Sequence, residues 1–352
     1  MTGSRLFDPQ TGVVPASAIL VSGLMLVFLP PAAAWAAPAL LLGALLLGWR
    51  KRPVGRGLLA AAALLTAGAV VGLAVSADRS ASVEKLWAVL SGLLMLLLVS
   101  RLSRSQLRPS MWMLLSVGVA LGFAADVQVD RNSWKLNAYN RAVYGLFAHV
   151  PRFSELALNQ NAVAAWLIGL IPLGLALTLV SDQPRSRLTA LLVTLFLFFQ
   201  LSLTDSRAAL LSLALGLAAG GLVPGGRYRW LGAMVVGGAL VLLRMGVFGS
   251  FQLTALPTGD SSRERVAIWV SSLHMLADAP FTGIGLGLFQ RVYPAYILPA
   301  YHTDHPHAHN LLLQTGADMG LLGIAGWLGF MVLAGWWIVD LARRPEPDSA
   351  TR

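Results

Sequence analysis

Four of the six histidines in the chain fall within eight residues, at His302, His305, His307 and His309. A continuously apolar segment follows them at once, so titratable side chains stand where a membrane helix is expected to begin. Neutral imidazole accepts a proton near pH 7 and also ligates zinc, so the segment suits either a general base or a metal site. A solvated histidine-rich loop without chemistry is the third interpretation.

The spacing of these histidines bears on the first two interpretations. His305, His307 and His309 alternate along the chain, which places them on one side of an extended segment, and Asp304 would add a further metal ligand. His309 is the best-placed general base, because Asn310 follows it and the apolar helix starts there.

Arginines occur at two other places where charge is costly. Arg207 ends the turn Thr204–Arg207 between two apolar segments, and Arg263 and Arg265 fall in the first turn of an amphipathic helix expected from Asp260. Positive charge at a helix start opposes the helix dipole, so a bound anion would explain it, and arginine offers phosphate a bidentate fork. Ordinary interfacial arginines, paired with nearby carboxylates, are the alternative.

The composition says which elements must position these residues. The chain has 352 residues, of which 56% are hydrophobic and 12% charged, and its mean hydropathy is +0.68. Apolar runs of about 20 residues recur, which predicts an all-α, polytopic transmembrane bundle. The chain has no cysteine, which excludes disulfides and cysteine-based metal sites. We attribute its net charge of +10 to cytoplasmic loops rather than to binding of nucleic acid.

About ten spans are expected, and they form one integral membrane domain over residues 1–352. They cover about residues 13–30, 32–49, 57–77, 83–100, 110–124, 160–180, 188–204, 207–223, 229–248 and 320–341. The piece 309–319 is too short to cross alone, so it is either a half-helix or the first turns of the last span. Arginine clusters between alternate spans place both termini in the cytoplasm, and the loop 249–308 on the periplasmic face of a bacterial inner membrane.

A glycine-rich segment runs from Pro280 to Phe289 and contains Gly283, Gly285 and Gly287. No strand is expected before it, so it does not fit a nucleotide-binding turn. The glycines are expected to permit a tight turn and a close approach of backbones.

Together these motifs resemble the O-antigen ligase superfamily of membrane glycosyltransferases, over about residues 155–341. The superfamily pattern of His, then Asn, Ser or Gln, nine residues and Gly-x-x-Gly matches His309, Asn310, Gly320 and Gly323. Further matches are Arg207…Leu211, Arg265…Trp269, the complete pattern from Pro280 to Phe289, and Asn159-Gln160-Asn161.

The resemblance implies a GT-C-like helical bundle that transfers a glycan from undecaprenyl diphosphate to an acceptor hydroxyl, without a metal or other cofactor. It implies His309 as base and Arg207 and Arg265 as cations for the diphosphate, with inversion at the anomeric carbon. Substrate contacts are expected from Asn310, His307, Arg263 and Asn161. The implied partners are the lipid-linked donor, membrane lipids, and either lipid A core or a growing glycan as acceptor. O-antigen ligation is the expected reaction, and polymerisation of O-antigen or exopolysaccharide is the alternative within the superfamily.

A transporter or flippase of lipid-linked sugars is the alternative from another class. It would place charged residues deep within spans, whereas the expected spans contain few acids and the charges gather at the outer edge. This distribution favours chemistry at the membrane surface. A noncatalytic membrane subunit would leave the histidine and arginine motifs without a purpose.

Overall fold

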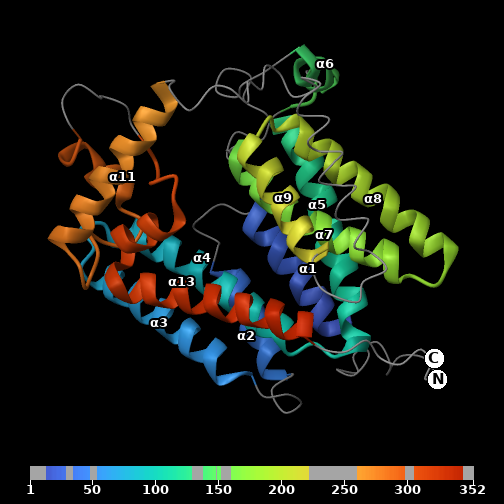
Figure 1. Ribbon diagram of the computed structural model, residues 1–352, viewed down its shortest axis with the longest axis horizontal. Coiled ribbons are helices and arrows are strands. Elements are labelled where there is room, and N and C mark those ends of the chain that lie inside the picture. Colours follow the sequence, from blue (N-terminus) through green and yellow to red (C-terminus); the bar gives the residue numbers. More distant parts are fainter. Residues whose placement is uncertain are drawn as a thin grey trace. The chain divides into compact units, whose positions relative to one another are not determined.

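The structure is a computed structural model that describes residues 13–28, 35–47, 54–128, 138–147, 149–151, 160–221, 260–297 and 305–343. Within these ranges it is helical and contains no strand, which confirms the all-α prediction (Figure 1). The helices are α1 (Val13–Phe28), α2 (Ala36–Leu47), α3 (Arg56–Ala74), α4 (Arg79–Ser100), α5 (Arg104–Gln128), α6 (Ala138–Leu146), α7 (Gln160–Val180), α8 (Pro184–Leu203), α9 (Arg207–Gly221), α11 (Asp260–Asp278), α12 (Phe289–Val292), the 3₁₀ turn η2 (Tyr293–Ala295) and α13 (Leu311–Arg343).

Six of the described helices are long and apolar enough to cross a membrane. They are α3, α4, α5, α7, α8 and α13, and each coincides with a predicted span. Three further predicted spans correspond to shorter apolar stretches in α1, α2 and α9. The span expected at 229–248 lies outside the described residues. The chain is therefore a multi-pass membrane protein.

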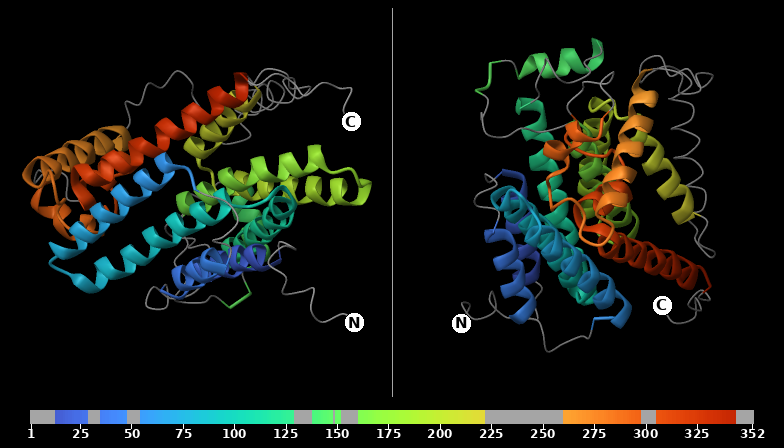
Figure 2. Two further views of the ribbon diagram at one scale, coloured as in Figure 1. Left: turned by 90° about the horizontal axis from the view of Figure 1, so that it is seen from below. Right: turned by 90° about the vertical axis from the view of Figure 1, so that its left-hand side faces the viewer.

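The chain divides into two compact units, and the first comprises residues 1–30, 102–251 and 338–352. Its core is leucine-rich and joins α5, α7, α8 and α9 through residues such as Leu115, Leu167, Leu197 and Leu201. Helices α7 and α8 follow one another directly and pack side by side (Figures 1 and 2). Gln200 in α8 donates a 2.7 Å hydrogen bond to the buried Asp126 in α5, so this core contains an acid within a helix.

The second unit comprises residues 31–101 and 252–337 and contains the histidine segment. Here α3 and α13 lie side by side (Figure 2), and small residues permit their contact. A Cβ added to Gly68 would lie 2.9 Å from the backbone nitrogen of Gly323, which is closer than side chains tolerate. The last glycine of the Gly-x-x-Gly motif therefore serves helix packing.

The first glycine of that motif breaks the last helix. Gly320 has φ 64° and ψ −158°, so a short helical piece at 311–319 precedes the longer one. Both alternatives expected for this piece hold in part, because it is continuous with the last span yet set off by a kink. The interrupted backbone groups find new partners, since the Leu321 N–H donates to the Pro280 carbonyl at 2.7 Å and the Ala317 carbonyl accepts from Ile284 N–H at 2.7 Å.

The segment that supplies those partners is the glycine-rich one. Gly283 has φ 68°, and a Cβ there would lie 2.5 Å from the Ala317 carbonyl oxygen. The expected close approach of backbones is thus confirmed, and the approaching backbone is the kink of α13. The two glycine motifs, about 30 residues apart in the chain, form one joint.

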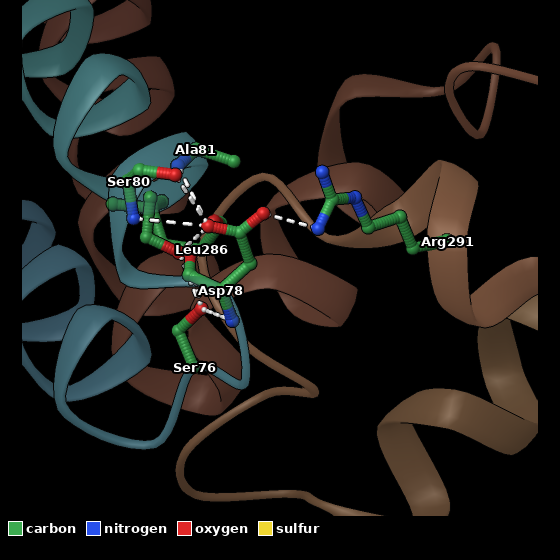
Figure 3. A network of polar contacts seen from close by, with 7 residues as sticks. Ser76, Asp78, Ser80, Ala81, Leu286 and Arg291 are labelled. Carbon is green, nitrogen blue, oxygen red and sulfur yellow. Dashed lines mark hydrogen bonds and ion pairs between the residues drawn. The ribbon is translucent and has the colours of Figure 1, made fainter.

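The same segment is fixed to α3 and α4 by a polar network (Figure 3). The Leu286 N–H donates to the Gly72 carbonyl at 3.1 Å, and the Leu286 carbonyl accepts from the Ser82 hydroxyl at 2.6 Å. Asp78 caps α4 by accepting from the backbone N–H groups of Ser80 and Ala81, and it forms an ion pair with Arg291 of α12. The hydrogen bond from the Ser80 hydroxyl is the main reason that the pKa of Asp78 falls below its usual value.

Candidate active site

Three histidines gather in the loop just before α13. The ring centroids of His307 and His309 are 4.2 Å apart, and those of His305 and His309 are 6.0 Å apart. The expected grouping of these three side chains is therefore present. His302 and Asp304, which the sequence offered as further ligands, lie outside the described residues. Within the described part of the chain, no group of three or more His, Cys, Asp or Glu side chains is arranged to hold a metal ion.

A buried alanine holds this loop in place. Ala308 is fully buried and packs with Ile268, Phe289 and Tyr293 in a small core. Its N–H donates a 2.8 Å hydrogen bond to the side-chain oxygen of Gln314, one turn into α13. Because Ala308 points into the core, its neighbours His307 and His309 are turned the other way, and His309 is exposed.

Asn310 begins α13. Its side-chain oxygen accepts hydrogen bonds from Leu312 N–H at 3.0 Å and Leu313 N–H at 3.2 Å, which is the geometry of an N-cap. His309 directly before it has φ 50°, a left-handed conformation that non-glycine residues adopt rarely and often at functional sites. The cap explains why asparagine follows the histidine here, and a contact between Asn310 and substrate stays a prediction.

The arginine helix meets this loop within the same unit. The expected amphipathic helix is α11, with Arg263, Glu264 and Arg265 in its first two turns. The carboxylate of Glu264 lies against the imidazole of His305, with 3.1 Å between Oε1 and Nε2. Arg265 is exposed, and its charge lowers the pKa of His309. The side chain of Arg263 is not among those that the structure describes.

These surroundings keep His309 neutral. Partial desolvation lowers the pKa of His309 to about 4, and electrostatic interactions with His307, Arg265 and His305 act in the same direction. Glu264 opposes them. Desolvation also lowers the pKa of His307, with help from Lys85 and His305. At neutral pH both imidazoles have a free nitrogen lone pair that can accept a proton.

Lys85 is a site residue that the sequence analysis missed. It lies in α4, which the network of Figure 3 fixes to the glycine segment, and its Cβ would be 3.2 Å from a Cβ on Gly287. Its charge reaches both His307 and the nearly fully buried Asp318 of α13. A lysine two turns into an apolar span was the available signal, because such charges are costly in lipid and usually have a function.

The other expected site residues lie in the first unit. Arg207 begins α9 after a tight turn in which Asp205 has φ 48°, and the side chain of Arg207 lies outside the description. This turn is tied to neighbouring helices. The carbonyl of Leu203 accepts hydrogen bonds from Asn140 and Tyr144 of α6.

Asn161 contacts the same turn. The Ser206 hydroxyl donates to the Asn161 side-chain oxygen at 3.2 Å, and the side chain of Gln160 binds the Thr204 carbonyl. Gln160 and Asn161 therefore support the arginine turn, while Asn159 lies outside the described residues. The structure thus groups His307, His309 and Arg265 in one unit, and Arg207 and Asn161 in the other.

Comparison with known proteins agrees with these motifs. Residues 190–328 match the family model described as O-antigen ligase. The matched region contains Arg207, Arg265, the glycine segment, His309 and Asn310, while Lys85 and Asn161 lie before it. No curated protein and no solved structure matches the chain.

Proposed function

We propose that this chain, a member of the O-antigen ligase superfamily through residues 190–328, transfers a glycan from undecaprenyl diphosphate to an acceptor hydroxyl. The reaction takes place at the periplasmic face of the bacterial inner membrane, and it inverts the anomeric centre. Lipid A core is the proposed acceptor, which makes the reaction an O-antigen ligation.

One observation supports this proposal most directly. An exposed histidine with a pKa of about 4 stands beside a second histidine, whose ring centroid is 4.2 Å away, and within the electrostatic reach of Arg265. A neutral base and a cation next to a membrane helix are the two groups that glycan transfer from a lipid diphosphate requires. The family match over the same residues supports this assignment.

In the proposed step, the acceptor hydroxyl oxygen attacks the anomeric carbon while His309 removes the hydroxyl proton. The new glycosidic bond forms as the bond from the anomeric carbon to the phosphate oxygen breaks. The electron pair of that bond leaves with undecaprenyl diphosphate, whose added negative charge Arg265 stabilises. The superfamily resemblance implies Arg207 as a second cation. Diphosphate is a good leaving group, so the step uses no general acid.

The remaining candidates serve binding in this proposal. Arg263 adds positive charge at the start of α11, and His307, Asn310 and Asn161 contact sugar or phosphate oxygens. Donor binding also raises the pKa of His309 from its low value, because the negative charge of the diphosphate offsets the positive charge of Arg265. Proton transfer is then favoured once the donor is bound.

The test is transfer in lipid vesicles that contain the purified protein, an undecaprenyl-diphosphate oligosaccharide and lipid A core. His309→Ala is expected to slow the chemical step by about 10² to 10⁴-fold, the usual contribution of a general base. His274→Ala is the matched control, because His274 is an exposed histidine of α11, and it should leave the rate unchanged. Full turnover by His309→Ala would remove His309 from the role of base.

Three further measurements test the stereochemistry, the need for a metal and the acceptor. Nuclear magnetic resonance of the product should show the anomeric configuration opposite to that of the donor, and activity should persist in EDTA. Replacing lipid A core with a second lipid-linked oligosaccharide distinguishes ligation from polymerisation. If product forms only with the second lipid-linked oligosaccharide as acceptor, the protein is a polymerase of the same superfamily.

A further inference from the structure

The contact between Glu264 and His305 joins the two elements that carry the proposed cation and base. Glu264 precedes Arg265 in α11, and His305 lies four residues before His309. The Nε2 to Oε1 distance is 3.1 Å, and the exposed fractions of the two side chains are 14% for His305 and 36% for Glu264. Because both side chains are partly buried, water competes less for this contact than for one on an open surface.

His305 is held on a rigid aromatic support. The edge of its ring meets Tyr293, with centroids 5.6 Å apart and planes at 79°. Tyr293 is almost fully buried and stacks on Phe289 of α12, with centroids 5.5 Å apart. The imidazole is therefore fixed by packing, and the carboxylate of Glu264 adds a directional contact to α11.

The far end of α11 is attached to the same support. The Ser271 hydroxyl donates to the Tyr296 carbonyl at 3.0 Å, and the Tyr296 hydroxyl donates to Asp278 at 2.8 Å. These bonds fix the middle and end of the helix. The pair of Glu264 and His305 supplies the corresponding attachment near its start, where Arg265 projects.

We propose that Glu264 and His305 are positioning residues, which set Arg265 and His309 at the separation that glycan transfer requires. This inference rests on the proposed function. A carboxylate near a diphosphate site would otherwise repel the donor, and its engagement by His305 gives it a purpose there. Glu264 also offsets part of the positive charge that acts on His309.

The first test compares replacements of different severity. Glu264→Ala and His305→Ala should each lower kcat about 10- to 100-fold, because small displacements of reacting groups have effects of this size, with little change in KM for the donor. Glu264→Gln keeps an acceptor for the His305 N–H and should retain most of the activity. Asp182→Ala is the control, because Asp182 is an exposed acid in a loop of the other unit.

Two outcomes of this comparison would overturn the proposal. If Glu264→Gln is as impaired as Glu264→Ala, the carboxylate takes part in proton transfer itself. If the fold loss of kcat in the double alanine variant equals the product of the two single losses, the residues act independently and no pair exists. The proposal expects the double variant to resemble either single variant.

The pH profile gives a further discrimination. His307, Arg265, His305 and Glu264 are the titratable or charged groups that act on His309, whose pKa of about 4 keeps it neutral above about pH 6 in the free enzyme. Glu264→Gln should therefore leave kcat/KM for the donor independent of pH from about pH 6 to 8, because this ratio reports the free enzyme. If the acid limb of the pH profile disappears in Glu264→Gln, Glu264 is the titrating base, which contradicts a positioning role.

Hydrogen exchange tests the attachment without any transferase activity. Amides in the first turns of α11 should exchange faster in Glu264→Ala and His305→Ala than in the unchanged protein or Glu264→Gln. Unchanged exchange would refute the attachment even if the enzyme is active. If the alanine variants exchange faster but the unchanged protein transfers no glycan, the attachment is supported and the proposed function is refuted.

Discussion

At the scale of single residues, neighbouring charges decide what each histidine can do. His307 and His309 both have a lowered pKa, mainly through desolvation, and a different cation acts on each. Lys85 comes from α4 and acts on His307, whereas Arg265 comes from α11 and acts on His309. Cations from two helices that are distant in the chain thereby add to desolvation in favouring the neutral form of two adjacent imidazoles.

Removing either cation should raise the pKa of its histidine, because the protonated ring then meets less repulsion. We expect Lys85→Met to raise the pKa of His307 and Arg265→Gln to raise that of His309. The measurement is a pH titration of histidine ¹³C and ¹⁵N shifts in detergent micelles. Arg79→Met, an exposed cation at the start of the same helix as Lys85, should change neither value. A fall in either pKa would contradict the electrostatic account.

At the scale of elements, the kink of α13 depends on a segment far back in the chain. The break at Gly320 leaves backbone groups that the glycine segment satisfies at Pro280 and Ile284. The same joint places the short piece 311–319, whose Gln314 holds the histidine loop through Ala308. The nine residues between Asn310 and Gly320 therefore set how far the proposed base lies from the helix break.

Gly320→Ala should destabilise the protein, because φ 64° and ψ −158° is a conformation essentially restricted to glycine that costs another residue about 1–3 kcal/mol. The new Cβ would also lie 2.7 Å from the Pro280 carbonyl oxygen. Thermal unfolding in detergent, followed by circular dichroism, should show a lower midpoint. Gly335→Ala is the matched control in the same helix, since no atom lies within 4 Å of its added Cβ and alanine favours helix. An equal midpoint for both variants would show that the kink is not required.

At the scale of the whole molecule, the membrane orientation decides which compartment supplies the substrates. Helix α7 has 21 residues, and a helix of that length spans about 30 Å, so the segments before and after it lie on opposite sides of a bilayer. Arg185 and Arg187 follow α7, so we predict that this side faces the cytoplasm.

Because the chain has no native cysteine, single cysteines report this orientation directly. A membrane-impermeant maleimide should label His149→Cys in cells with a permeabilised outer membrane, and Asp182→Cys only after the inner membrane is opened. Both positions are exposed, so accessibility within the protein is matched. The reverse labelling pattern would place the Thr204–Arg207 turn, at the far end of α8, in the cytoplasm and would exclude the proposed donor.

The sequence alone determined the helical membrane class, the six long spans that the structure describes, and the residues worth testing, because these depend on local hydrophobicity and on residue type and spacing. Tertiary structure decided the rest. It showed that Asn310 caps a helix, that Glu264 binds His305 and that Lys85 acts on His307. It also placed two buried acids, Asp126 and Asp318, inside helices where the sequence suggested few. The Asn310 cap is local, but the contacts of Glu264 with His305 and of Lys85 with His307 join residues 41 and 222 positions apart, and no pattern along one chain records which distant groups fold together.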